Sequence, residues 1–192
     1  MIEELSPKIE LTSDFEKNIE KAFNYFSDNL NNKFSRPRLF EKFVYIENHE
    51  IIDNKPAGFW HAISLEENHK FADVLPCVND PTISDCGANC NNSQKTITIK
   101  AGTEKRNICL LRASMLPWIV DIIRLANAGN NHISYWEKEK KIYIRYLHRG
   151  IDYILIFADN NKFYRLISSY PVFYLKEKRE FDSDSIMHAI KK

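Results

Sequence analysis

Apolar residues follow a helical period near the start of this chain and a two-residue period near its end. Between Phe15 and Leu30 they recur every three or four positions, which predicts an amphipathic helix. Ser13 and Glu16 have the spacing of a capping box, so we expect the helix to begin there. Its aromatic stripe is more typical of a core or docking face than of a cofactor site.

The second half of the chain predicts strands packed on one helix. Ser114 can cap a helix from Met115 to Ala128, because Pro117 lies in its first turn, where a missing amide costs little. Gly129 is a natural stop. Strand patterns joined by short polar turns follow at residues 133–136, 141–147, 151–158 and 162–170. We expect them to form an antiparallel meander with the apolar segment 151–157 at its buried centre.

The region between these parts is less regular. Residues 38–52 favour a short helix followed by a strand, and the bounded aromatic run Phe59–Ile63 favours a strand. Ser64 to Glu67 repeats the capping-box spacing and predicts a short helix. Asp73–Gln94 is long and aperiodic, as in loops that are functional, disordered or clamped. Residues 95–100 alternate as a half-buried strand does.

These elements predict an α+β fold. A C-terminal helix packs on an antiparallel β-meander of about four strands, preceded by a mixed, partly helical N-terminal portion. We place the division near residue 100. Residues 1–100 form the N-terminal portion with an irregular cysteine-containing loop, and residues 101–192 form the α+β unit.

Composition narrows the class of protein. The chain has 192 residues, 44% of them hydrophobic, which suits a globular fold. No apolar run approaches the ~20 residues of a membrane helix. The first residues are acidic where a signal peptide is basic. Four cysteines are too few for a disulfide scaffold. We therefore expect a cytoplasmic protein with no membrane partner.

Charge is divided unevenly along the chain. Residues 1–99 carry 10 Lys and Arg against 16 Asp and Glu, whereas residues 100–192 carry 17 against 10. The net charge of +1 therefore hides an acidic half and a basic half. A basic half is consistent with an anionic partner, although two surfaces of mixed charge also differ this much.

Four short motifs of the basic half resemble a known superfamily. They are Arg112-Ala-Ser-Met-Leu-Pro-Trp-Ile119, Tyr143-Ile-Arg-Tyr146, Ile151-Asp-Tyr-Ile-Leu-Ile-Phe157 and Ser168-Ser-Tyr-Pro171. Together they resemble phage-type members of the barnase, EndoU, colicin and RelE-like nucleases over roughly residues 106–181. The family often has Thr-x-Tyr-Pro in place of the last motif, and no catalytic His is evident near the start of the unit. The resemblance implies helices before a four-stranded antiparallel sheet, and RNA cleavage without a metal or other cofactor.

Such a reaction needs a base for the 2′-hydroxyl, an acid for the 5′-oxygen, and cations for the phosphorane. His148 is our candidate acid or base, because its ordinary pKa lies near neutrality. Arginine suits phosphate because its fork donates two parallel hydrogen bonds. The predicted catalytic residues are His148, Arg145, Ser168, Tyr170 and Arg112. The predicted substrate-binding residues are Arg149, Lys141, Tyr143 and Arg165.

Each assignment has a plainer alternative. The arginines also suit a solvated sheet edge, His148 an exposed turn, and Ser168 with Tyr170 the closing of a strand. His61 and His132 are reserve candidates, and His61 also suits an aromatic core. A zinc site is an alternative for the thiols, although their spacing lacks the paired Cys-x2-Cys of common sites. These are Cys77, Cys86, Cys90 and Cys109.

The sequence thus predicts a metal-independent ribonuclease, of the kind found among prophage toxins or effectors, with RNA and a protein inhibitor or partner as its expected partners. The alternative is a non-catalytic RNA- or protein-binding module on the same fold. A third interpretation takes the helix Phe15–Leu30 as the docking element of a structural phage component. His148 lying within reach of Ser168, Tyr170 or an arginine would favour the enzyme, and His148 in open solvent would favour binding.

Overall fold

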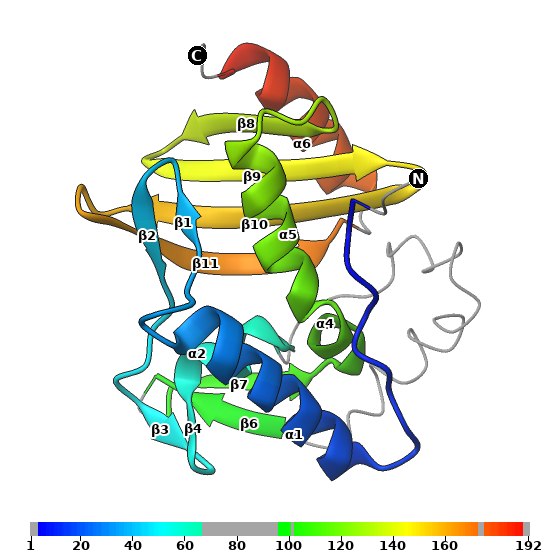
Figure 1. Cartoon of the computed structure of the whole chain (residues 1–192), viewed down its shortest axis with the longest axis vertical. Helices are drawn as coiled ribbons and strands as arrows, with labels where there is room; N and C mark the ends of the chain where they lie inside the picture. The colour runs from blue at the N-terminus through cyan, green and yellow to red at the C-terminus, as the bar shows by residue number, and fades with distance from the viewer. Residues whose placement is uncertain (1–3, 67–95, 101, 173–174, 190–192) are drawn as a thin grey trace.

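The computed structural model describes residues 4–66, 96–100, 102–172 and 175–189. A large curled sheet occupies one end of the molecule, and a smaller helical and stranded unit occupies the other (Figure 1). The expected α+β class is confirmed.

The large sheet has six strands in the order β1-β2-β11-β10-β9-β8. The meander is antiparallel throughout, as expected. Its strands are β8 (Ile133–Lys138), β9 (Lys141–His148), β10 (Ile151–Asp159) and β11 (Phe163–Pro171). The sheet extends further than expected, because β2 (Lys42–Tyr45) pairs in parallel with β11 and forms a hairpin with β1 (Arg38–Leu39).

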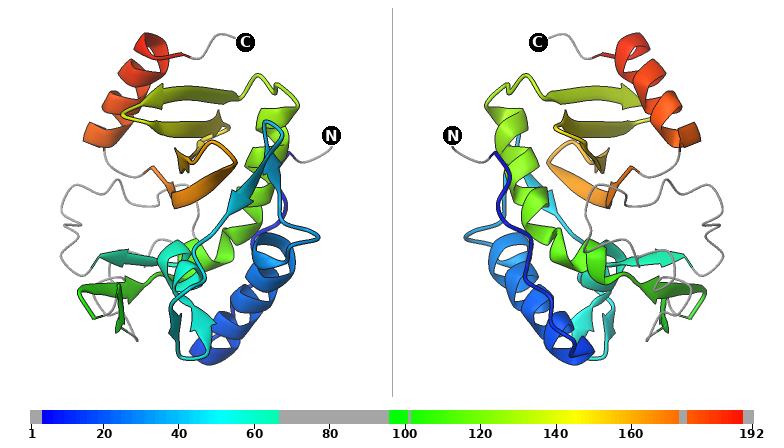
Figure 2. Two further views of the ribbon diagram at one scale, coloured as in Figure 1. Left: turned by 90° about the vertical axis from the view of Figure 1, so that its left-hand side faces the viewer. Right: turned by 90° about the vertical axis from the view of Figure 1, so that its right-hand side faces the viewer.

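A helix covers each face of this sheet (Figure 2). The helix α5 (Leu116–Asn127) lies on the face that carries Ile144, Tyr146 and Leu155, which belong to the main core. The helix α6 (Leu175–Met187) lies on the opposite face, where Phe181 packs near Trp136 in a second, smaller core. Since both faces are covered, β10 is apolar on both sides, as the sequence predicted.

The smaller unit surrounds an aromatic cluster in which the Phe59 ring meets the Phe23 and Phe26 rings of the first helix edge to face. Its helices are α1 (Phe15–Phe26), the π-helical turn η1 (Ser27–Asn31), α2 (Ala57–Ala62) and α4 (Leu110–Ser114). Its strands are β3 (Ile51–Ile52), β4 (Lys55–Pro56), β5 (Ser64–Glu66), β6 (Thr96–Ile99) and β7 (Glu104–Ile108). They form a hairpin, β3-β4, and a three-stranded sheet, β5-β7-β6.

The portions expected on either side of residue 100 share one sheet and one core. Strand β2 pairs with β11, and the main core joins Ile19 and Phe26 of α1 to Ile119 and Ile122 of α5. The aromatic face of α1 is therefore covered by the protein's own core, which counts against the docking-helix interpretation.

Three local predictions are wrong. Residues 38–45 form strands rather than a helix, Phe59–Ile63 lies mostly in the helix α2, and Ser64–Glu66 is the strand β5. Tertiary pairing explains the last change, because β5 completes a sheet with β7. The helix α2 is only six residues long, and its adjacent residues Phe59 and Trp60 are both buried. Neither the two-residue period of a strand nor the 3.6-residue period of a helix can be recognised in so short a segment.

Two predicted helix caps also differ. Asp14, not Ser13, caps α1 by accepting a hydrogen bond from the Lys17 amide. Ser114 instead donates its hydroxyl to the Leu111 carbonyl within α4, and α5 starts at Leu116 without a side-chain cap.

A β-bulge interrupts β11. Ile156 of β10 pairs with Ser168, but the next residue, Phe157, pairs with Leu166, so Ile167 is an extra residue. Leu166 and Ser168 therefore face opposite sides, whereas residues two apart in a regular strand share a face. Bulges re-aim side chains, and this one turns the segment around Ile167 toward the smaller unit.

No helix among the described residues is both long and apolar enough to cross a bilayer.

Candidate functional site

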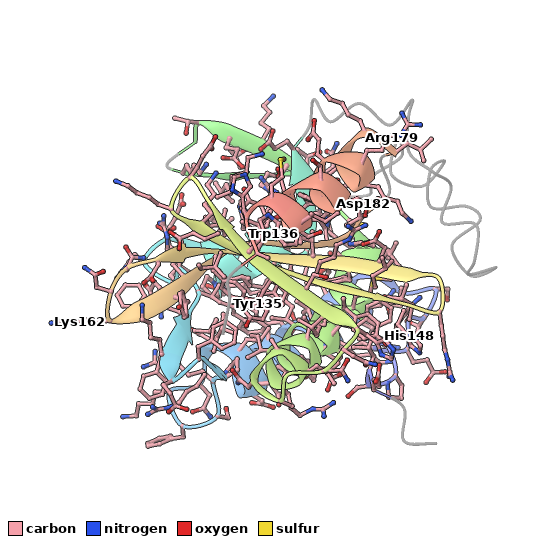
Figure 3. The ribbon with its side chains drawn as sticks, turned by 90° about the horizontal axis from the view of Figure 1, so that it is seen from above. Tyr135, Trp136, His148, Lys162, Arg179 and Asp182 are labelled. Carbon is pink, nitrogen blue, oxygen red and sulfur yellow. The ribbon has the colours of Figure 1, made fainter. Side chains whose placement is uncertain are left out.

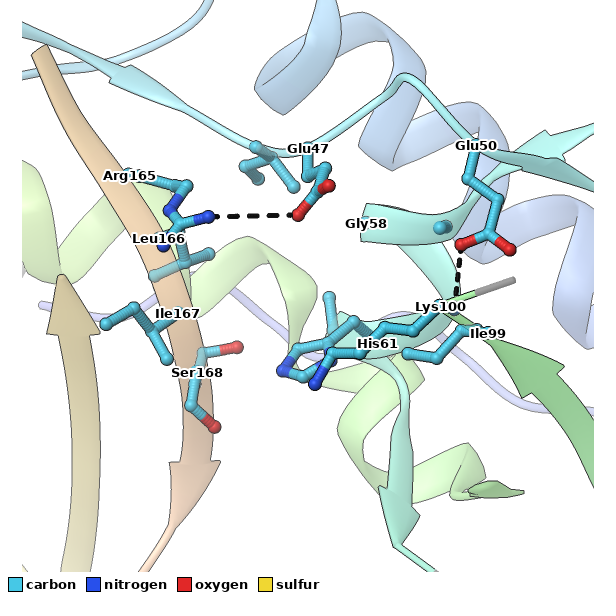
Figure 4. Close-up of a pocket in the computed structure, with 14 residues that line it drawn as sticks. Glu47, Glu50, Gly58, His61, Ile99, Lys100, Arg165, Leu166, Ile167 and Ser168 are labelled. Carbon is cyan, nitrogen blue, oxygen red and sulfur yellow. Dashed lines mark hydrogen bonds and ion pairs between the residues drawn. The ribbon is translucent and has the colours of Figure 1, made fainter. Parts of the chain in front are cut away.

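A pocket of about 220 Å³ lies where the bulged strand β11 meets the smaller unit (Figure 4). Arg165 to Ser169 of β11 form one wall, and Ala57 to Ala62 of α2, together with the end of β6, form the other. Gly58 makes this junction tight, because a Cβ there would lie 2.2 Å from the Glu47 carbonyl oxygen. Only glycine allows the segment after β2 to approach α2 so closely.

His61 projects from α2 into this pocket toward Ser168 (Figure 4). Burial lowers the pKa of His61 to about 4, and the nearby charges of Arg106 and Arg112 act in the same direction. Glu104 and a hydrogen bond to the backbone of the bulge residue Ile167 oppose the shift. The imidazole is therefore neutral at pH 7 and able to accept a proton.

Two guanidinium groups lie behind His61. Arg106 donates to the Ser64 hydroxyl at 2.8 Å and to the Ser64 carbonyl at 3.1 Å, and Arg112 donates to the same carbonyl at 2.9 Å. Arg106 also pairs with Glu104. Glu66 lies 3.9 Å from the same Arg106 guanidinium. Among the described residues no carboxylate lies within ion-pair distance of Arg112, so the positive charge of Arg112 has no direct counter-ion.

Tyr170 connects β11 to α6. Its ring lies below the Arg112 guanidinium at 5.0 Å, and its hydroxyl donates to Glu177. Burial raises the pKa of Tyr170, so the hydroxyl stays protonated. Tyr170 therefore positions Arg112 and does not line the pocket.

Further charges lie at the pocket rim. Arg165 approaches Glu47, with 3.9 Å between its Nη1 and the nearer carboxylate oxygen. Lys100 pairs with Glu104, and its backbone amide donates to Glu50 at 2.8 Å. Arg165 and Lys100 therefore line the pocket as members of ion pairs with carboxylates of the same chain.

Arg145 was predicted to be catalytic, but its contacts join parts of the fold to one another. Its side chain is 3% exposed, and its guanidinium forms two hydrogen bonds to Asp152, at 2.7 and 2.6 Å. A third, at 2.7 Å, reaches Asp182 of α6. Figure 3 shows Asp182 and His148 on opposite sides of the sheet. The expected convergence of Arg145 and His148 is therefore wrong, because the pleat and the helix α6 place Arg145 on the far face.

His148 lies in a second pocket with Arg149 and the N-terminal segment. Its ring stacks on that of His132, with centroids 3.6 Å apart. His132 in turn contacts the Glu4 carboxylate at 2.9 Å. None of the described residues lines both pockets, so His148 cannot act with Ser168 in one site.

The remaining predicted residues are also separated. Tyr143 stacks on Trp136 at 5.3 Å in the smaller core, and Lys141 opens β9 opposite Lys138. Ser168 and Arg165 alone of the nine predicted residues line the His61 pocket, with Arg112 behind it. Cys109 is buried, and the other three cysteines of the zinc alternative lie outside the described residues.

The sequence identified His61 only as a reserve candidate and did not single out Arg106. For His61 the one local signal was its position beside Trp60, since Ser168, which it faces, lies 107 residues further along the chain. The period of a strand or helix shows which face a residue lies on, but not which distant segment that face will contact.

No protein-family model, curated protein or solved structure matches this chain. The nuclease resemblance therefore stays a prediction.

Proposed function

We propose that the chain is a metal-independent endoribonuclease whose reaction takes place in the His61 pocket, not around His148. The observation that carries the proposal is the neutral imidazole of His61, which faces Ser168 of the bulged strand β11. The guanidinium groups of Arg106 and Arg112 lie behind it. Perturbed histidines in pockets are common at catalytic sites.

His61 supplies the base. With a pKa of about 4 it is unprotonated at neutral pH and accepts the proton of a ribose 2′-hydroxyl. The 2′-oxygen then attacks the adjacent phosphorus, and a 2′,3′-cyclic phosphate forms as the bond to the 5′-oxygen breaks. The Ser168 hydroxyl donates its proton to the leaving 5′-oxygen and takes up the proton of the imidazolium. Both side chains are then in their starting protonation states.

The arginines supply the charge. Arg106 and Arg112 are held on the Ser64 carbonyl before any substrate binds, so their positive field costs no reorganisation during the reaction. Arg165 and Lys100 at the rim suit the neighbouring phosphates of an RNA strand. The +7 charge of residues 100–192 adds a longer-range attraction for such a polyanion.

The test is cleavage of single-stranded RNA in EDTA by the purified full chain and by His61→Asn. We expect the wild type to release 2′,3′-cyclic phosphate ends, and His61→Asn to be about 10²- to 10⁴-fold slower, the usual contribution of a general base. Ser168→Ala should also be slower. His188→Asn, which changes an exposed histidine, is the matched control and should cleave as the wild type does.

Equal cleavage by His61→Asn and the wild type would overturn the proposed site. RNA binding without cleavage by the wild type would instead support the alternative of a non-catalytic RNA-binding module on this fold. Arg165→Ala then decides whether the same pocket binds the RNA, because its loss should weaken binding in either case.

A further inference from the structure

The second pocket, lined by the N-terminal segment and the end of the meander, contains three groups that can ligate a metal. Glu4, His132 and His148 each offer a donor atom, and the three atoms lie within 4.8 Å of one another. Glu4 comes from the first described residues, His132 precedes β8, and His148 ends β9. Residues about 130 apart in the sequence therefore meet at one corner of the sheet.

The two imidazole rings constrain each other. They are nearly parallel, with 15° between their planes and 3.6 Å between their centroids. An imidazole ring binds a metal ion through one ring nitrogen. The two stacked rings each have a nitrogen within 4.8 Å of the Glu4 carboxylate, so both can reach the same ion.

The carboxylate of Glu4 is already oriented. Asn130 donates to its Oε1 at 3.0 Å, and the Tyr146 hydroxyl donates to its Oε2 at 2.9 Å. Hydrogen bonds of this kind, from residues that do not themselves bind the ion, orient ligands in metal sites and raise affinity.

We propose that Glu4, His132 and His148 form a zinc site that fastens the N-terminal segment to the end of β9. Two nitrogens and one carboxylate oxygen are a common donor set for a zinc ion with one open position. Neighbouring ligand atoms around tetrahedral zinc lie ~3.3 Å apart, so small side-chain rotations from the present spacing suffice.

The charges around the site determine its fourth ligand. Lys8 and Arg149 line the same pocket, and Lys8 lies 5.5 Å above the Trp118 ring. With Zn²⁺ and one carboxylate the site has a net positive charge even before these two are counted. An anion such as hydroxide therefore fits the open position better than a neutral group.

This site is separate from the proposed reaction. It shares no lining residue with the His61 pocket, and the proposed cleavage proceeds in EDTA. Failure of either proposal therefore leaves the other intact.

Calorimetric titration of the tag-free, chelator-treated full chain with Zn²⁺ tests the proposal. We expect one ion per chain, and at least a tenfold increase in Kd for each of Glu4→Gln, His132→Asn and His148→Asn. Zn²⁺ should also raise the melting temperature of the wild type, but not that of His148→Asn. Melting without metal verifies that each variant is folded.

Two controls make the result specific. His188→Asn alters an exposed histidine, and Cys86→Ser with Cys90→Ser removes the thiol alternative; both should keep the wild-type Kd. Substituting Co²⁺ gives visible absorption bands without the intense sulfur-to-metal band of thiolate ligation. Zinc affinity unchanged in the three ligand variants, or lost in the cysteine variant, overturns the assignment, as does the absence of zinc binding by the wild type.

Discussion

A single neutral histidine shows how local environment sets chemistry in this protein. His61 is no different from His188 in sequence terms, yet burial beside Arg106 and Arg112 lowers the pKa of His61 to about 4. The folded protein therefore keeps this side chain unprotonated through a pH range in which the unfolded chain binds a proton.

The stability of the fold should depend on this histidine between about pH 4 and pH 6.5. Because the unfolded state binds more protons there, the contribution is complete above pH 6.5 and is lost as the pH falls toward 4. The pKa difference corresponds to about 3 kcal/mol. Urea unfolding of the wild type and His61→Gln at pH 4.5 and 7 measures it. The free energy of unfolding of His61→Gln should change less between the two pH values, and equal changes would contradict the depressed pKa.

At the level of elements, the ion pairs of Arg145 tie three parts of the chain together. The residue sits on β9, Asp152 on β10 and Asp182 on α6, so one guanidinium joins neighbouring strands to the covering helix. Arginine on a strand suggested phosphate binding from the sequence. Its side chain is instead buried, and its Nε, Nη1 and Nη2 all donate to carboxylates of the same chain.

Arg145→Ala should therefore act on stability. The change leaves buried Asp152 with only Lys178, whose Nζ lies 3.6 Å from Oδ2, which costs about 3 kcal/mol. Asp182→Asn should cost no more than ~1 kcal/mol, since the Asp182 side chain is 54% exposed. Arg179→Ala, on the exposed face of α6, is the control and should be neutral. Chemical denaturation measures all three, and wild-type stability of Arg145→Ala would contradict the structural role.

Across the whole molecule, the parallel pairing of β2 with β11 makes the two portions of the chain interdependent. The meander alone would expose the edge of β11 and the face of α5 that packs against α1. The His61 pocket also exists only when both portions are present, because α2 supplies one wall and β11 the other.

We therefore expect residues 101–192, produced alone, to lack a cooperative thermal transition. Mixing this fragment with residues 1–100 should restore the transition, since the interface is apolar and extensive. Circular dichroism melting of the separate and mixed fragments is the measurement. A cooperative transition for residues 101–192 alone would show that the division near residue 100 marks an independent domain.

The sequence by itself determined the elements whose residues interact with near neighbours. The strand patterns of β8 to β11, the stop at Gly129 and the amphipathic pattern of α1 are local, and all three appear in the structure apart from the bulge at Ile167. Side-chain periods of 2 and 3.6 residues depend on backbone geometry alone, so they can be read without knowing the fold.

Only the tertiary structure decided which chemical groups meet. Ser168 lines the same pocket as His61 because a bulge at Ile167 and a glycine at residue 58 bring β11 and α2 together. Arg145 turned away because one step of the pleat separates the two faces of a strand. Such convergences join residues dozens to more than a hundred positions apart, and no local pattern records them, because they arise from the packing of whole elements.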